Sequence, residues 1–482
     1  MLFIACQSVL WSSTLYYTNG ILGLANNEAG CELLDDDETC ENLVHGIMKP
    51  TSLATLVAAI NLAGTSICLP FLGGLVDKHE HAGLFGLYNT LFLAFCTLLS
   101  STIHSRNGWT LLFYILISTI MYTSMALNSV IANSFFHSFG KEPDDLFALT
   151  AFNFKVRVPS FILTIFFTSV VSLSAGLDDI ETAQTAQSLS FLGVLASTYI
   201  WWVFMSNKKI RFAGDTSISS FKDIYNTIMS LDRTLKFYLS HLALAGAAII
   251  SVISTSTIFL SESLNMSSGE IGMAMLLFAL FAIPGSKVSQ ILSSRTDPLI
   301  SLQLNLVLWV LTFPIASAVL DGRDFFQFSY IFCAFWGTLF GWFNVNNFSV
   351  TVLLIPKERS GGSNVVMGVY VFSITILSWL PTLIFTILNE ADIDMRLGLL
   401  TFDCFYIFAF LILRYLVGDF SEARRFVHRE NPNEVEVQQS DEESIQQADV
   451  RSVQRSDEES IQQSNKVIMQ QSDVGNNACI GA

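Results

Sequence analysis

The chain has 482 residues, of which 51% are hydrophobic and only 14% are charged, and its mean hydropathy is +0.50. This composition excludes a water-soluble enzyme, because soluble domains carry about 25% charged residues. The formal charge of -16 argues against a nucleic-acid partner, since binding to phosphates needs clustered Lys and Arg. The eight Cys form no CxxC pair, and we expect neither a metal nor another cofactor.

Twelve segments are apolar over the roughly 20 residues that a helix needs to cross the hydrocarbon core of a membrane. No basic region or cleavage site precedes the first segment, so we expect it to be retained. The sequence therefore predicts an all-α membrane protein with twelve transmembrane helices in two six-helix halves. The first six segments lie near 1–25, 51–76, 84–103, 109–132, 151–175 and 188–205, and the others near 237–261, 270–292, 299–319, 325–350, 365–388 and 394–416.

The loop at 26–50, between the first two segments, is acidic, with seven Asp and Glu against the single base Lys49. Its acidity favours translocation or simply keeps the loop solvated. The loop also contains Cys31 and Cys40. In an oxidising compartment these two residues can form a disulfide that restrains the loop, although the spacing alone leaves the bridged and the free forms open.

The segment 206–236 separates the two predicted halves, 1–205 and 237–416, and contains six Lys and Arg. If the chain crosses the membrane at all twelve segments, eighteen Lys and Arg near the segment ends lie on the same side of the membrane as this loop. Four lie on the opposite side. Basic residues near the ends of membrane spans stay in the cytoplasm. We therefore expect 206–236 to be a cytosolic central loop and both termini to be cytosolic.

The composition changes after Arg429 to Gln, Ser, Glu and Asp, which predicts that 417–482 is a disordered cytosolic tail. The tail is repetitive, because SDEESIQQ occurs at 440–447 and again at 456–463. Ser440 and Ser456 each precede Asp-Glu-Glu and are candidate phosphorylation sites. The alternative is a low-complexity repeat without a function.

Two halves of six spans joined by a basic loop resemble the major facilitator superfamily, whose halves pack around a solute site at the middle of the membrane. Gly73, Asp77 and Lys78 resemble part of the motif that this superfamily carries after its second span. The resemblance implies that they form a gating loop at the cytosolic helix ends. The alternative is ordinary punctuation at the end of a span.

Longer passages resemble the autophagy-related vacuolar effluxer family within this superfamily. They are KPTSLATLVAAINLAG with LPFLGGLVD, STYIWWVFM, FLSESLNMSSGEIGMAMLLFALFAIPG and IPKERSGGSNVVMGVYVFSITILSWLPTLIFTILNE. The resemblance implies efflux of amino acids from the lumen of a vacuole or lysosome to the cytosol during autophagy.

Two titratable residues within the spans are candidates for coupling transport to protons. Asp403 lies near the middle of the last span, where an unpaired carboxylate is costly. It is either a proton-coupling site or a buried acid paired with a neighbouring helix. His241 lies early in the seventh span and is either a proton-sensitive group or a core or interfacial histidine.

Uncharged polar side chains in the spans are the remaining candidates for binding a solute, because amides and hydroxyls can hold the two charges of a zwitterion. The same groups also join helices as structural hydrogen bonds. The candidates are Gln7, Tyr16, Asn19, Asn128, Asn344 and Asn347.

We expect a monomeric, multi-pass transporter whose partners are the lipid bilayer, a small organic solute and, if transport is coupled, protons. The vacuolar or lysosomal membrane is the expected location and the plasma membrane the alternative. A carrier of another solute and a non-transporting nutrient receptor on the same fold remain open. An enzyme finds little support, because the sequence has no HExxH and no GxSxG motif.

Overall fold

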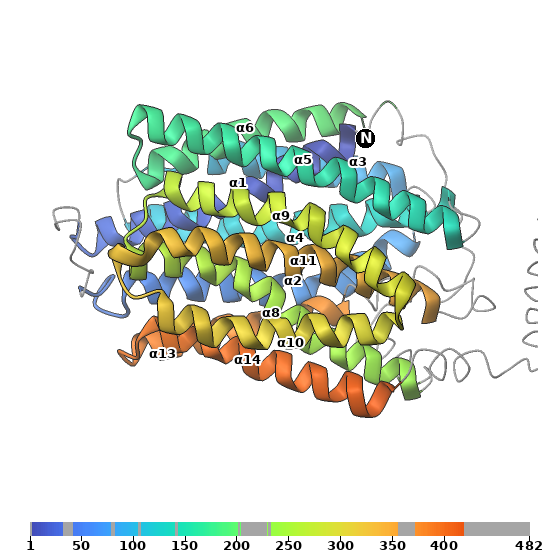
Figure 1. Ribbon diagram of the computed structural model, residues 1–482. Coiled ribbons are helices and arrows are strands. Elements are labelled where there is room, and N and C mark those ends of the chain that lie inside the picture. Colours follow the sequence, from blue (N-terminus) through green and yellow to red (C-terminus); the bar gives the residue numbers. More distant parts are fainter. Residues whose placement is uncertain are drawn as a thin grey trace, which may run out of the picture. The chain divides into compact units, whose positions relative to one another are not determined.

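A computed structural model describes residues 2–31, 42–78, 82–104, 108–139, 143–200, 233–354 and 372–418, together with positions 203 and 229. The described residues form α-helices that lie side by side along one direction, with connections at both ends (Figure 1). The first six helices are α1 (Leu2–Glu28), α2 (Pro50–Lys78), α3 (Ala82–Ser100), α4 (Gly108–Phe139), α5 (Pro143–Ala175) and α6 (Asp179–Ile200). The next six are α8 (Arg233–Leu264), α9 (Ser268–Arg295), α10 (Pro298–Val319), α11 (Phe326–Leu354), α13 (Trp379–Glu390) and α14 (Met395–Ile412).

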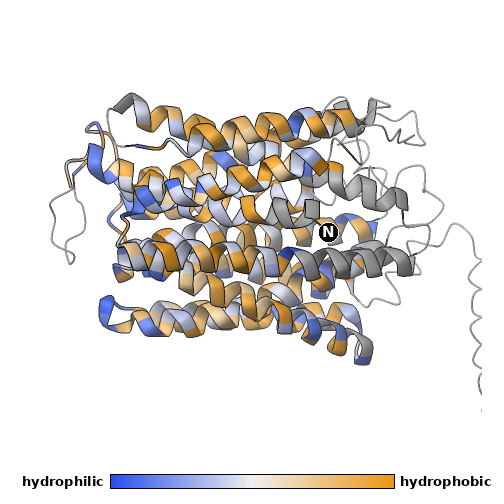
Figure 2. Ribbon diagram, turned by 90° about the horizontal axis from the view of Figure 1, so that it is seen from above, coloured by the Kyte–Doolittle hydropathy of each residue, from blue (hydrophilic) through white to orange (hydrophobic). Residues whose placement is uncertain are grey.

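Nine segments in the described part of the chain are long and apolar enough to cross a membrane, and Leu84–Ser100 is a shorter apolar helix. The hydrophobic residues lie along the helices, and hydrophilic residues gather toward the helix ends and loops (Figure 2). Helices α1 and α6 are not among these nine segments. Both helices carry polar residues, which they bury against each other. For example, Gln187 donates to the carbonyl of Ser13, and Ser190 donates to that of Val9.

Several boundaries differ from the predicted spans. The fifth span was placed at 151–175, for example, but α5 begins at Pro143, and α4 continues to Phe139 beyond the predicted 132. Two other differences have a local cause. The sixth span was placed at 188–205, but α6 begins nine residues earlier because Asp178 accepts a hydrogen bond from the backbone of Glu181 at 2.6 Å and so starts the helix. The eleventh span was placed at 365–388. Its described part begins at Phe372, contains a turn at 376–378, and continues as α13 with Pro381 in its first turn. Proline has no N–H to donate, which favours an interruption at this point.

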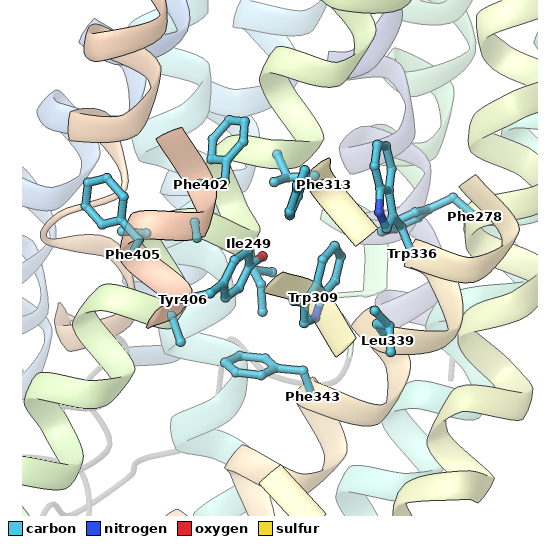
Figure 3. Packing of buried hydrophobic residues seen from close by; sticks show 14 of the residues in the cluster. Ile249, Phe278, Trp309, Phe313, Trp336, Leu339, Phe343, Phe402, Phe405 and Tyr406 are labelled. Carbon is cyan, nitrogen blue, oxygen red and sulfur yellow. The ribbon is translucent and has the colours of Figure 1, made fainter. Parts of the chain in front are cut away.

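Aromatic side chains from α10, α11 and α14 form the core of the second half (Figure 3). Trp309 stacks on Tyr406 with ring centres 5.3 Å apart and planes 9° apart. Phe313 stacks on Trp309 and on Trp336. These residues are almost fully buried, so stacked aromatic rings form the apolar centre of the second half.

Helices α9 and α11 approach each other closely. A methyl group added at Gly285, Gly337 or Gly341 would overlap the backbone carbonyl of Thr338, Phe278 or Ala282, respectively. Glycine permits this approach because it has no side chain, and close backbone approach is a main source of helix association in membranes.

Candidate functional site

Several hydrogen bonds join the first six helices to the last six. These bonds lie in the part of the bundle from its middle to one end, the end at which α1 finishes and α2 begins. The distribution of Lys and Arg predicts that this end is exoplasmic. We call this the exoplasmic end, and we call the set of contacts between the two halves the polar seam. The polar seam is the candidate functional site.

Helices α2 and α13 form one side of the polar seam. Asn389 donates to the Ser52 hydroxyl at 2.8 Å, and one turn deeper Thr386 donates to the Thr55 hydroxyl at 2.7 Å. Near the middle of the helices, Ser66 donates to the backbone carbonyl of Thr375 at 2.5 Å. This carbonyl lies just before the turn at 376–378, so an irregular part of the chain faces the other half.

Helices α5 and α9 form the other side of the seam, together with α1. Tyr16, one of the predicted candidates, is bonded to the Ser169 hydroxyl at 2.7 Å and donates to the carbonyl of Ile165. A side chain at Gly272 of α9 would overlap the hydroxyls of Tyr16 and Ser169. Glycine at this position therefore lets the two halves approach closely at a pair of hydroxyls.

Asn19, a second predicted candidate, also lies in the seam. Its amide donates to the Ser268 hydroxyl at 3.3 Å, and Ser268 donates to the carboxylate of Asp179 at 2.5 Å. The Asn19 side chain is 1% exposed, and its Oδ1 has no hydrogen-bond partner among the described residues. An orphaned buried acceptor is costly, so Asn19 weakens this part of the seam.

The loops at the exoplasmic end add an ion pair between the halves, Lys49 with Asp392. Both side chains are accessible to water, so the pair adds little stability. Within the second half, Arg396 hydrogen-bonds the Asp394 carboxylate and lowers the pKa of Asp394. Cys31 belongs to a disulfide, but Cys40 lies outside the described residues, so their pairing stays a prediction.

His241 and Asn347 lie together away from the seam, toward the opposite end of the second half. His241 is fully buried, and its Nδ1 donates to the carbonyl of Ala409 at 3.0 Å. Tyr238 donates to both the carbonyl and the amide oxygen of Asn347. Nε2 of His241 and Nδ2 of Asn347 have no hydrogen-bond partner among the described residues. These side chains tie α8, α11 and α14 together.

Asp403 lies in the aromatic core of the second half, one turn before Tyr406. Its side chain is 7% exposed, and in the described part of the chain neither its Oδ1 nor the Tyr406 hydroxyl has a hydrogen-bond partner. For Oδ1, the part of the chain that the structure describes therefore offers no bond to a neighbouring helix, and the choice between the two interpretations of Asp403 stays a prediction. A buried carboxyl group without a cation is a candidate for carrying a proton.

The structure places Asn128 and Asn344 in contacts within one half. Asn128 exchanges hydrogen bonds with Asn89 and Thr90 and so joins α3 to α4. Asn344 donates to the carbonyl of Phe340 in its own helix. The side chains of Gln7, Gly73, Asp77 and Lys78 lie outside what the structure describes, so their roles stay predictions.

The sequence analysis did not single out the residues that make up most of the seam. Ser52, Thr55 and Ser66 interrupt an apolar helix at one-turn and three-turn intervals, and Thr386 and Asn389 do the same in α13. That spacing is the available signal, since it places these side chains on one face of each helix. Asp179, which accepts from Ser268, was missed as well, because carboxylates at the ends of spans usually face water. Among the described residues, no group of three or more His, Cys, Asp or Glu could hold a metal ion.

The sequence matches no protein-family model and no curated protein. Solved structures do match. The nucleoside transporter NupG superposes with a TM-score of 0.58 at 15% identity, covering 86% of this chain and 98% of that one. A D-xylose-proton symporter gives a TM-score of 0.60 at 12% identity, covering 87% of this chain and 97% of that one.

A bacterial homologue of the iron transporter ferroportin matches in two states. The inward-facing state gives a TM-score of 0.58 at 13% identity over 88% of this chain and 98% of that one, and the outward-facing state gives 0.52 at 14% over 85% and 98%. At these identities the similarity concerns the fold. The chain has the all-α major facilitator fold that the sequence predicted.

Proposed function

We propose that this protein is a secondary transporter of small organic solutes that works by alternating access, with its two halves moving about the polar seam. The observation that carries the proposal is the seam itself. It joins the halves at one end through single hydrogen bonds between hydroxyls and amides, such as Thr386 with Thr55. Contacts of this kind can break and form again at low cost, unlike the glycine contact of α9 with α11.

The seam is formed at the exoplasmic end, which corresponds to an inward-facing conformation. The higher TM-score against the inward-facing state of the ferroportin homologue supports this assignment. The similar structures carry nucleosides, D-xylose and iron, so the fold itself does not select a substrate.

Amino acids are the substrate class that we propose, moved from the lumen of a vacuole or lysosome to the cytosol during autophagy. The support is the resemblance of four sequence passages to the vacuolar effluxer family. One of them contains Thr375, whose carbonyl accepts from Ser66, and another contains Ser268 of the seam. A carrier of another small solute and a non-transporting nutrient receptor are the alternatives.

Reconstitution into liposomes with a panel of radiolabelled amino acids, nucleosides, sugars and organic anions tests the proposal. We expect saturable flux of an amino acid and little flux of the other classes. The matched control is the double variant Ser52→Cys and Asn389→Cys, whose positions are within hydrogen-bond reach in the seam. Cross-linking the two thiols should stop flux, and cleaving the link should restore it. Binding without flux would favour the receptor instead.

Proton coupling through Asp403 is a separate part of the proposal. An Asp403→Asn variant keeps the size and polarity of the side chain but fixes the neutral state. If coupling runs through this carboxyl, the variant should exchange solute across the membrane yet lose accumulation driven by a pH gradient. If Asp403 is only structural, folded protein at matched levels should keep gradient-driven uptake and lose thermal stability instead.

A further inference from the structure

Arg157 of α5 is a charged residue at the edge of a membrane-spanning segment. It is the first residue of the apolar stretch Arg157–Ala175, which is long enough to cross a membrane. The stretch has 19 residues, which corresponds to a helical rise of about 28 Å. The hydrocarbon core of a membrane is about 30 Å thick, so Arg157 lies at its boundary on the side that is predicted to be cytosolic.

The position of Arg157 around the helix places it on the buried face of α5. A helix turns about 100° per residue, so Arg157 lies within about 20° of both Thr164 and Thr168. These two threonines are 4% and 0% exposed. The opposite face carries Leu163 and Phe166, which are 67% and 49% exposed. Arg157 therefore does not share the face that meets lipid, where an arginine that only anchors a helix at the membrane surface is expected.

The described residues supply no counter-ion for Arg157. The ion pairs in the described part of the chain use Lys49, Arg323 and Arg396, all of which lie toward the exoplasmic end. Arg157 itself is partly exposed. A cation in a membrane span is costly, and it usually pairs with an acid or meets water inside the bundle. The buried face and the partial exposure of Arg157 favour contact with water inside the bundle.

The two halves separate toward the level of Arg157. Helices α5 and α9 are antiparallel, and they meet where Gly272 of α9 lies against Ser169 of α5. Arg157 lies about three turns from this contact, toward the cytosol. On the face of α9 that carries Gly272, Leu276 is still buried at 7%, but Ile283 is 36% exposed. The interface is therefore more open on its cytosolic side, as expected for an inward-facing conformation.

A second polar group on the same face of α5 also lacks a partner. Oγ1 of Thr168 has no hydrogen-bond partner among the described residues, although the side chain is 0% exposed. An orphaned buried hydroxyl is costly, and a polar solute on this face would supply the missing partner. The face thus carries an unpaired cation at its cytosolic end and an orphaned hydroxyl next to the polar seam.

The chemistry of arginine selects one class of ligand. The guanidinium group has five N–H donors in a fixed plane and accepts no hydrogen bond. It matches a carboxylate through two parallel charge-assisted bonds, which a neutral sugar or nucleoside cannot form. We propose that Arg157 binds the carboxylate of the transported solute. The inference rests on the proposed transport function, and it narrows the substrate to carboxylic acids, amino acids included.

Ligand binding to the purified full-length chain in lipid nanodiscs tests this inference, measured as the rise of the thermal midpoint with ligand concentration. The probes are a mixture of L-amino acids and the matching mixture of amino-acid amides, in which a carboxamide replaces each carboxylate. We expect the acids to bind about thirtyfold more tightly than the amides. Arg157→Gln should weaken binding of the acids by a similar factor. Arg157→Lys keeps the charge but loses the planar fork, and should weaken it about tenfold.

A matched variant and a second readout keep the test decisive. Arg414→Gln removes an exposed arginine just after α14 and should bind the acids normally. Modification of Arg157 by phenylglyoxal, followed by peptide mass spectrometry, needs no variant and decides the matter if Arg157→Gln folds poorly. At ten times their apparent dissociation constant, the acids should slow this modification about tenfold, and the amides at the same concentration should not.

The outcomes separate this inference from the proposed function. Equal binding of acids and amides, or normal binding of acids by folded Arg157→Gln protein, would overturn the site and leave the transport proposal intact. Stronger protection of Arg157 by inorganic phosphate than by any carboxylate would overturn the assignment to carboxylates. Protection by a mixture of monocarboxylates and dicarboxylates, without protection by amino acids, would support the site and exclude amino acids as the substrate.

Discussion

The second and fourth helices of each half meet in different ways. In the first half, Asn61 of α2 donates to Ser118 of α4 at 2.6 Å and accepts from Thr119 at 2.7 Å. In the second half, α9 and α11 meet through Gly285, Gly337 and Gly341, whose Cα atoms lie against carbonyl groups of the other helix.

This difference shows that one fold can use either of the two sources of helix association available in a membrane. Water does not drive helices together there, so close packing and hydrogen bonds must do so. Close packing is rigid, because backbone atoms cannot rotate away. Hydrogen bonds between side chains tolerate small displacements.

The largest effect is expected from Gly341→Ala. The new methyl group would overlap the carbonyl of Ala282, which cannot move without separating the helices. Overpacking of this kind costs about 1–3 kcal/mol or more. We expect a large loss of monodisperse protein after heating in detergent, measured by fluorescence-detected size-exclusion chromatography.

Gly64→Ala in α2 is the matched substitution in the first half. Its methyl group would meet only the Thr119 methyl, at 3.2 Å, and that side chain can yield. Alanine also favours a helix over glycine by about 1 kcal/mol. The thermal midpoint should stay within a few degrees of the wild-type value, and equal losses in both variants would contradict the proposed difference between the halves.

Gly272→Ala should have an intermediate effect of a different kind. The methyl group would overlap the hydroxyls of Tyr16 and Ser169, which lie at the ends of side chains and across the polar seam. We expect folded protein with a nearly normal thermal midpoint but a smaller fraction in the closed conformation. The distance between spin labels on cysteines introduced at the exposed positions His104 and Asp324 measures this fraction. A variant that loses thermal stability but keeps the normal closed fraction would show that the contact is structural only.

Asn61→Ala should cost less than Gly341→Ala. It removes two side-chain hydrogen bonds between α2 and α4, and such bonds within membranes contribute about 0.6 kcal/mol each. Asn344→Ala is the control, because that amide bonds only to the carbonyl of Phe340 in its own helix. A thermal midpoint that falls equally in the two variants would show that the bonds between the helices add nothing.

The smallest effect concerns Asp394, outside the membrane, where water competes with every ion pair. The hydrogen bond from Arg396 holds the pKa of Asp394 below its usual range, so folding favours the ionised carboxylate. Its contribution, less than about 1 kcal/mol for an accessible pair, is present above about pH 4 and is lost as pH falls through the lower pKa. The midpoint difference between wild type and Asp394→Asn should therefore disappear in acid, and a constant difference would point to another cause.

The sequence predicted the helices well because membrane spans are specified by local composition. Hydropathy and the spacing of Lys and Arg need no knowledge of which helix touches which. The exceptions were α6, whose buried Gln187 and Ser190 lower its hydropathy, and the turn at 376–378. Hydropathy misses both, because one depends on a local cap at Asp178 and the other on Pro381.

The polar seam was harder to predict because its partners lie far apart in the chain. Tyr16 and Asn19 could be chosen as polar residues in an apolar helix. Asn19 donates across the seam, and the Tyr16 hydroxyl lies against Gly272 of the other half. Thr55 and Thr386 are separated by 331 positions, and neither residue is unusual alone. Only the arrangement of the helices reveals which hydroxyls meet, and the same applies to Asp179 and Ser268.

The stacking of Trp309 on Tyr406 gives the protein an optical reporter of its own. An indole fixed 5.3 Å from a parallel ring and only 1% exposed should produce a strong near-ultraviolet circular dichroism band. Its chromophores lie inside the second half and do not take part in the seam. The band should therefore stay constant while the halves move and vanish only when the core melts, which separates conformational cycling from unfolding in a single unlabelled sample.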